Sequence, residues 1–425
     1  MQDDQDQRPS VLYIFWPRGV APGLEELRYR AAQSFEAEGG VGDSDDAAEG
    51  SKVWEQRFHV PGLREAVTIW ARRPDSEALE LGCLAHWRDE REAEEARACQ
   101  WWIGVEVSLD PFDPLKSYHT QLRFCRELVP ESPALFDACS MRVRSRQELE
   151  RLTTTRVPPR LSELFSVHTV ASEGLASDVG AWVHSHGLAR AGGPEIDLLG
   201  VPADFVAAAH QLVGGAAELV VAGELPRAGQ RLEIGENLRV TWSSWQDTLF
   251  EWPHLLDAVD AIGDGDEHGG ERIVLVELSV DPRLIADSPC PLDALSALKR
   301  RSGVLFMSKR ETERMAHMAR ERWSIFGMLF ARSRLKGLSD WRFVVKLGYP
   351  VDGTAREHEH LWFRVEGIAP DRVRGVLLNE PIHLPDFRRG AEGWHDLEQL
   401  TDWGIETPRG SFSPETADIL WDIDM

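Results

Sequence analysis

Residues 341–353 read WRFVVKLGYPVDG and residues 357–381 read EHEHLWFRVEGIAPDRVRGVLLNEP, and these two stretches decide the fold of the C-terminal part. In the second stretch, apolar side chains alternate with polar ones at Leu361, Phe363 and Val365, as a half-buried β-strand requires. The Asp352-Gly353 pair before it is a strong hairpin signal, and Pro381 stops further pairing after a strand at 372–378. Several short strands at this spacing predict a small, strongly bent β-sheet or partial barrel over 339–425.

A helix is expected directly before this module. Apolar and aromatic side chains recur at helical spacing after Ser308, at Met315, Ala319, Trp323, Phe326 and Phe330. Gly337 is a natural end for this helix. We interpret this stripe as core rather than as a cofactor site. Residues 301–338 are therefore expected to form a long helix that braces the middle of the chain against the C-terminal module.

The remainder of the chain mixes strand and helix patterns. Apolar runs predict strands at 11–16, 101–109, 180–186 and 273–280, and helical spacing predicts helices at 24–35 and 202–221. The segment 141–164 contains VPPR, which resists both helix and central strand, so a boundary is placed there. At 425 residues the chain is too long for one ordinary core. We expect an α+β fold with one or two antiparallel-sheet units, divided into an N-terminal domain at 1–160 and a middle domain at 161–300.

The charge of the chain limits its partners. Its 71 acidic and 47 basic residues give a formal net charge of −24, which repels phosphate backbones and anionic lipid surfaces. Nucleic acid and membranes are not expected as partners. A basic protein is the expected partner. Residues 1–10 lack the basic and then apolar pattern of a secretory signal, and no stretch is expected to reach the roughly 18 apolar residues of a membrane span. These features predict a cytoplasmic protein.

One segment has the spacing of a metal site. In WVHSHGLARAGGPEID, at 182–197, His184 and His186 are two residues apart, so on a strand both imidazoles point to one face. If the next residues fold back as a hairpin, Glu195 opposes His186 and Asp197 opposes His184. This set is suited to a divalent transition metal such as zinc. In the alternative interpretation, the histidines only form hydrogen bonds in a half-buried sheet, and no cofactor is present.

The C-terminal segment resembles the YegJ-like family of uncharacterised bacterial domains. The matching residues are Glu359, His360, Leu361, Trp362, Gly375, Asn379, Pro381, Asp402 and Trp403. The resemblance implies no assigned chemistry. It makes His360, Trp362, Asn379 and Trp403 the candidate partner-binding residues, with an exposed Trp362 or Trp403 as anchor. Residues 165–253, which include WSSWQDTLFEWP, resemble the uncharacterised domain that commonly precedes such a module in two-part bacterial proteins.

Familiar catalytic signatures are missing from the sequence: there is no GxSxG elbow, Walker phosphate loop, GxGxxG or HExxH. This favours a binding protein over an enzyme. We expect a non-enzymatic cytoplasmic module that docks a basic partner, in its most specific form an immunity or antagonist protein. The alternative function is a metal-dependent hydrolase or metal-binding protein that uses His184, His186, Glu195 and Asp197.

Overall fold

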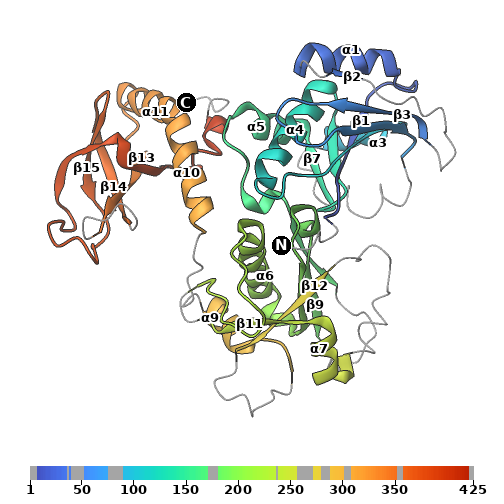
Figure 1. The fold of residues 1–425 in the computed structure, drawn as a ribbon. Helices are drawn as coiled ribbons and strands as arrows, with labels where there is room; N and C mark the ends of the chain where they lie inside the picture. The colour runs from blue at the N-terminus through green and yellow to red at the C-terminus, as the bar shows by residue number, and fades with distance from the viewer. Residues whose placement is uncertain are drawn as a thin grey trace. The chain divides into compact units, whose positions relative to one another are not determined.

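The structure is a computed structural model that describes residues 7–35, 38–39, 52–74, 90–170, 180–235, 238–255, 271–278, 288–300, 308–351 and 358–420. The chain divides into two compact units, Met1–Ser308 and Lys309–Met425. The described parts contain three sheets, most of whose strand pairs are antiparallel, so the expected α+β class is confirmed (Figure 1).

The N-terminal sheet of the first unit has the strand order β2-β3-β4-β5-β1-β6-β7 and is antiparallel throughout. Its strands are β1 (Ser10–Trp16), β2 (Glu38–Gly39), β3 (Lys52–His59), β4 (Val67–Arg72), β5 (Trp101–Val107), β6 (Ala134–Asp137) and β7 (Arg142–Ser145). The helices are α1 (Leu24–Phe35), α3 (Glu90–Arg97), α4 (Pro114–Leu128) and α5 (Arg146–Thr154). Successive side chains of β1 point to opposite faces of the sheet. On one face, Leu12 and Ile14 lie in the core with α1 and α4. On the other face, Phe15 packs with Trp102 and with Ala96 of α3.

The second sheet of this unit has the order β11-β12-β10-β9-β8. Its strands are β8 (Ser166–Val170), β9 (Ala181–His186), β10 (Glu195–Val201), β11 (Val240–Ser244) and β12 (Arg272–Glu277). β10 and β12 are parallel, and the other pairs are antiparallel. Helices α6 (Val206–Ala222) and α9 (Leu292–Lys299) pack in the large core with one face, and α7 (Trp245–Glu251) lies with a smaller aromatic cluster.

Helix α6 corrects one expectation from the sequence. Residues Ala203–Ala222 are long and apolar enough to cross a membrane, although no such stretch was expected. A core helix of a soluble protein passes the same test, and Ala209, Leu212, Val213 and Ala216 of α6 are fully buried in the core of the first unit.

The C-terminal unit is one antiparallel sheet with helices on one face. The order is β16-β15-β14-β13-β17-β18. The strands are β13 (Arg342–Pro350), β14 (His358–Ile368), β15 (Arg372–Leu377), β16 (Glu392–Asp396), β17 (Leu400–Thr407) and β18 (Gly410–Phe412). Leu361, Phe363 and Val365 are buried as the alternation predicts, and they share a core with Ala319 and Phe326 of the preceding helices. The Asp352-Gly353 turn lies outside the described residues.

Two details of this unit differ from the expectation. The single long helix is two helices, α10 (Lys309–Glu321) and α11 (Trp323–Leu335), which break at Arg322, whose guanidinium donates to the Pro414 carbonyl. The sheet runs from β16 at one edge to β18 at the other and does not close, so the partial barrel is not supported.

Candidate functional site

Strand β9 brings two of the predicted metal ligands together. The Nε2 atoms of His184 and His186 lie 2.9 Å apart, and the ring of His168 on β8 is centred 4.7 Å from that of His186. Trp182 stacks on His184 at 4.1 Å. Alternate residues of the strand therefore share a face, as expected. In the Nε2 contact one ring donates and the other accepts, and the tautomer decides which ring donates.

The hairpin register places Asp197 opposite His184, as the spacing predicts. The carboxylate of Asp197 is nevertheless held by other groups. It accepts hydrogen bonds from the indole N–H of Trp182 at 2.8 Å and of Trp245 at 2.6 Å, and both oxygens contact the guanidinium of Arg272. A carboxylate with this many donors is a structural anion that joins three strands and α7.

The carboxylate of Glu195 is bound by groups other than the histidines. Its carboxylate accepts from the Ser185 hydroxyl at 2.6 Å and from the backbone N–H of Gly187 at 2.8 Å and of Ala189 at 3.2 Å. Gly187 has φ 111°, and a Cβ there would lie 2.5 Å from the carbonyl oxygen of Leu164. Glu195 therefore holds a turn that only glycine fits.

The four predicted metal residues thus separate into a pair of imidazoles and two carboxylates with other roles. Within the ranges that the structure describes, no group of three or more His, Cys, Asp or Glu side chains is arranged to hold a metal ion. The sequence spacing located the hairpin correctly. It gave no sign of the indole and guanidinium donors that surround Asp197.

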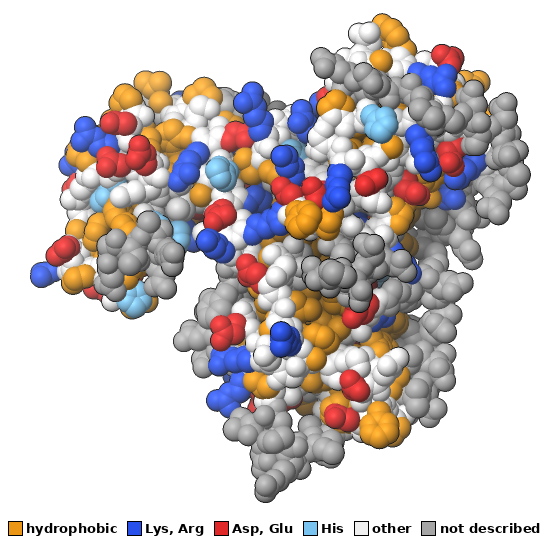
Figure 2. Space-filling model, viewed as in Figure 1, with side chains coloured by type: hydrophobic (Ala, Val, Ile, Leu, Met, Phe, Trp, Pro, Cys, Tyr) orange, Lys and Arg blue, Asp and Glu red, His pale blue; other side chains and the backbone are white. Residues whose placement is uncertain are grey.

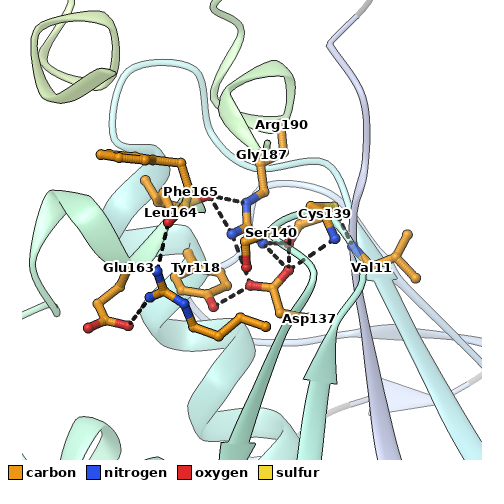
Figure 3. Close-up of polar contacts among 12 residues, drawn as sticks. Val11, Tyr118, Asp137, Cys139, Ser140, Glu163, Leu164, Phe165, Gly187 and Arg190 are labelled. Atoms are coloured by element: carbon orange, nitrogen blue, oxygen red, sulfur yellow. Dashed lines mark hydrogen bonds and ion pairs between the residues drawn. The ribbon is translucent and has the colours of Figure 1, made fainter. Parts of the chain in front are cut away.

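A second cluster, buried in the first unit, joins its two sheets (Figure 3). Arg190 follows β9 and donates to both carboxylate oxygens of Asp137, at the end of β6, at 2.9 Å each. Tyr118 donates to the same carboxylate at 2.7 Å, and the guanidinium of Arg190 lies 4.5 Å from the centre of its ring. Arg190 also donates to the Leu164 carbonyl. All three polar side chains are fully buried.

Charge pairing decides the protonation of this cluster. Burial raises the pKa of Asp137, but the guanidinium groups of Arg190 and Arg144 and the hydrogen bonds to the carboxylate outweigh burial, so its pKa is lowered. Burial also raises the pKa of Tyr118 well above its usual value. Asp137 is therefore a carboxylate and Tyr118 a neutral phenol. Because these side chains are enclosed, we interpret the cluster as a structural clamp.

In the C-terminal unit, the residues of the family pattern organise a loop. Both carboxylate oxygens of Glu359 accept backbone N–H groups, from Ile382 at 2.6 Å and from His383 at 2.8 Å. The side-chain oxygen of Asn379 accepts the backbone N–H of Trp362 at 2.8 Å. The loop after β15 is thereby tied to β14, and it presents Ile382 with an exposed fraction of 83%.

The other candidate partner-binding residues have different surroundings. Trp403, one of the two candidate anchors, is a core residue that is 1% exposed and donates to the Ala319 carbonyl at 3.0 Å. Trp362 is half-buried, with the Lys346 ammonium 5.7 Å from its ring centre. His360 contacts the Thr401 hydroxyl at 3.1 Å, and burial, then Lys346 and His358, lower its pKa. Of the two tryptophans, only Trp362 reaches the surface.

An exposed tryptophan that the sequence interpretation missed lies on β16. Trp394 is 52% exposed, and Glu392 and Asp396 on the same strand are exposed as well. β16 is the edge strand of the sheet. The signal in the sequence is EGWHD at 392–396, where charged or aromatic side chains alternate with Gly393 and His395. This alternation places Glu392, Trp394 and Asp396 on one face.

Three family models match the chain. Residues 58–159 match the N-terminal part and residues 167–273 the C-terminal part of a protein of unknown function (DUF4026), and residues 311–422 match an uncharacterised protein conserved in bacteria (DUF2314). The chain joins both parts of DUF4026 to DUF2314. No curated protein and no solved structure was found to match it.

The buried clamp and the edge strand β16 fall within different family matches. The Asp137–Arg190 pair joins the N-terminal part of DUF4026 to the C-terminal part, and both parts also share one hydrophobic core within the first unit. β16 and the loop held by Glu359 both lie within DUF2314.

Proposed function

We propose that this chain is a non-enzymatic protein-binding module that docks a basic partner in the cytoplasm, in its most specific form an immunity or antagonist protein. The observation that supports this proposal best is the exposed Trp394 between the carboxylates of Glu392 and Asp396 on an edge strand. Tryptophan is among the side chains most enriched at the energetic centres of interfaces. Flanking carboxylates favour a cationic partner and speed its association.

A second feature of the same unit supports docking. Ile382 is 83% exposed in a loop whose backbone is fixed by Glu359 and Asn379. An apolar side chain on a loop held in place loses little conformational freedom on binding, which favours affinity. The narrower assignment of this unit to YegJ-like modules is likewise a proposal.

The distribution of charge divides the roles of the two units. Lys309–Met425 contains 17 of the 47 basic and 20 of the 71 acidic residues, so most of the acidic excess belongs to Met1–Ser308. Figure 2 shows acidic and basic side chains intermingled on one face of the molecule rather than gathered in one large patch. The first unit therefore contributes a long-range field that attracts cations, and the short-range contacts are assigned to DUF2314.

The experiment compares capture by wild-type and variant full-length protein. Immobilised protein is exposed to bacterial lysate from about 0.1 M to about 1 M salt, over which the Debye length falls from about 10 Å to about 3 Å. We expect a basic protein to be retained at low salt, and to be lost at high salt and with Trp394→Ser or Ile382→Ser. Phe250→Ser is the matched control, because Phe250 is 88% exposed but lies on α7 of the first unit. Capture indifferent to salt and to both variants would contradict the proposal.

One observation favours the alternative of a metal-binding protein or metal-dependent hydrolase. The imidazoles of His168, His184 and His186 gather on one face of β8 and β9, with ring centres 4.7 to 6.0 Å apart. Against it, Glu195 and Asp197 are engaged elsewhere. Elemental analysis of untagged protein tests this alternative. One equivalent of zinc that is lost in the double variant His184→Ala with His186→Ala supports a metal site, and substoichiometric metal removes this candidate.

A further inference from the structure

β16 is the edge strand of its sheet, and among the residues that the structure describes no strand pairs with its outer side. The Ala391 carbonyl accepts from the Leu377 N–H, and the Leu397 N–H donates to the Asp371 carbonyl, both at 2.9 Å. The N–H and C=O of one residue point to the same side of a strand, and the side alternates along the chain. Odd-numbered residues of β16 therefore bond toward β15. The N–H and C=O groups of Glu392, Trp394 and Asp396 point outward.

We propose that β16 accepts an extended segment of the partner protein as a seventh strand, with Lys or Arg two residues before and two residues after a central apolar side chain. This inference rests on the proposed function and names the recognition mode. The central residue would oppose Trp394, and the two cations would oppose Glu392 and Asp396, because these three side chains share one face. The added strand is antiparallel, so its central residue forms a hydrogen-bonded pair with Trp394 and donates its N–H to the Trp394 carbonyl.

The same charges disfavour a second copy of this chain as the occupant. An antiparallel pair of β16 strands centred on Trp394 would place Glu392 of each copy opposite Asp396 of the other. Like charges directly opposite each other destabilise a strand pair, and opposite charges stabilise it. Charged side chains on an edge strand also disfavour self-pairing of sheets. The charges of β16 thus disfavour pairing with β16 of a second copy and favour pairing with a basic strand.

Neighbouring residues hold this edge in position. Arg374 of β15 forms an ion pair with Glu392 at 2.6 Å, and Trp394 pairs with Arg374 in the register. On the opposite face of β16, the His395 ring lies 4.3 Å from that of Phe363 and its Nδ1 contacts the Tyr349 hydroxyl at 2.6 Å. The strand is therefore held on one face by His395 and on the other by the ion pair of Glu392 with Arg374, and its outer edge is left for a ligand.

The test uses full-length protein and synthetic peptides of defined backbone chemistry. The first peptide has Ile at its centre, Lys two residues to each side and Thr elsewhere. The second replaces both Lys with Glu, and the third carries an N-methyl group on the central Ile, which removes a backbone donor. Affinity is measured by surface plasmon resonance, and hydrogen exchange of the segment 390–397 is followed by mass spectrometry. We expect the Lys peptide alone to bind and to slow exchange in this segment.

Charge variants of the edge separate recognition from nonspecific attraction. Glu392→Gln with Asp396→Asn is expected to weaken the Lys peptide by about 2- to 30-fold, the usual effect of two cross-strand charge pairs. Glu392→Lys with Asp396→Lys should instead prefer the Glu peptide. Glu313→Gln with Glu406→Gln, exposed residues of α10 and β17, is the matched control and should change nothing. Circular dichroism confirms that each variant is folded.

Several results would overturn this proposal while leaving the proposed function intact. They are equal binding of the N-methylated peptide, unchanged exchange in 390–397, no measurable binding of the Lys peptide, or no reversal of preference in the Lys variant. In each case, salt-dependent capture of a basic protein that still depends on Trp394 would keep the docking function. A dimer of the wild-type chain that Trp394→Ser dissociates would assign the edge to a second copy instead.

Discussion

Replacing Arg190 by Met tests whether the clamp between the two parts of DUF4026 determines the stability of the first unit. The change keeps an unbranched side chain but removes the guanidinium that donates to both oxygens of Asp137 and to the Leu164 carbonyl. Asp137 is then left as a buried carboxylate without its principal counter-charge. We expect a large loss of folding free energy in the variant.

The magnitude follows from what remains around the carboxylate. Removing one partner of a buried ion pair typically costs about 3–5 kcal/mol. Asp137 keeps the Tyr118 hydroxyl and the backbone N–H groups of Cys139 and Ser140 as donors, so the lower end, about 3 kcal/mol, is expected. The double variant Asp137→Asn with Arg190→Met removes both charges. It should therefore be more stable than Arg190→Met alone.

Urea unfolding followed by circular dichroism measures these differences. The matched control is Lys299→Ala, because Lys299 and Asp204 form an ion pair at 3.4 Å with both side chains well exposed. Its loss should be below about 1 kcal/mol. The reasoning is refuted if Arg190→Met costs no more than this control, or if the double variant is less stable than Arg190→Met.

Three further predictions concern pH, packing and thiols. The pKa of Asp137 is lowered in the folded protein, so its contribution to the free energy of unfolding is complete above its unfolded pKa of about 3.9. This contribution is lost as pH falls through the lower folded value. Urea titrations should therefore show that the difference in free energy of unfolding between wild type and Arg190→Met becomes smaller in acid. Gly375→Ala should lose about 1–3 kcal/mol, since a Cβ there would lie 2.8 Å from that of Phe363, whereas Gly214→Ala, in open space on α6, should gain about 0.5–1 kcal/mol in the same assay. Burial raises the pKa of Cys99 to about 11, so thiol-reactive dye at pH 8 should label this residue only after unfolding. Labelling of Cys99 in the native protein, located by peptide mass spectrometry, would contradict this.

The sequence predicted local structure well where one face of an element is buried. The alternation at Leu361, Phe363 and Val365 matches β14, and the spacing of His184 and Asp197 gave the correct hairpin register. Both patterns involve residues close in the chain. Period and turn length are sufficient to describe such contacts.

Contacts between distant residues could not be predicted in this way. Trp245 and Arg272, which bind Asp197, are 48 and 75 residues away from it in sequence, so no local spacing reveals them. Trp403 is buried beside the irregularity of register between β13 and β17, which the alternation does not show. The helix break at Arg322 has no proline or glycine to mark it.

Because Asp137 and Arg190 lie in different parts of DUF4026, each part depends on the other for a buried counter-charge. A shortened gene that encoded only residues 1–160 would yield a polypeptide whose β6 carboxylate has lost its counter-ion and whose apolar surface has lost its covering. Each half alone is therefore expected to be less stable than the joined unit. Recombination is expected to preserve the two parts of DUF4026 as a single inherited block.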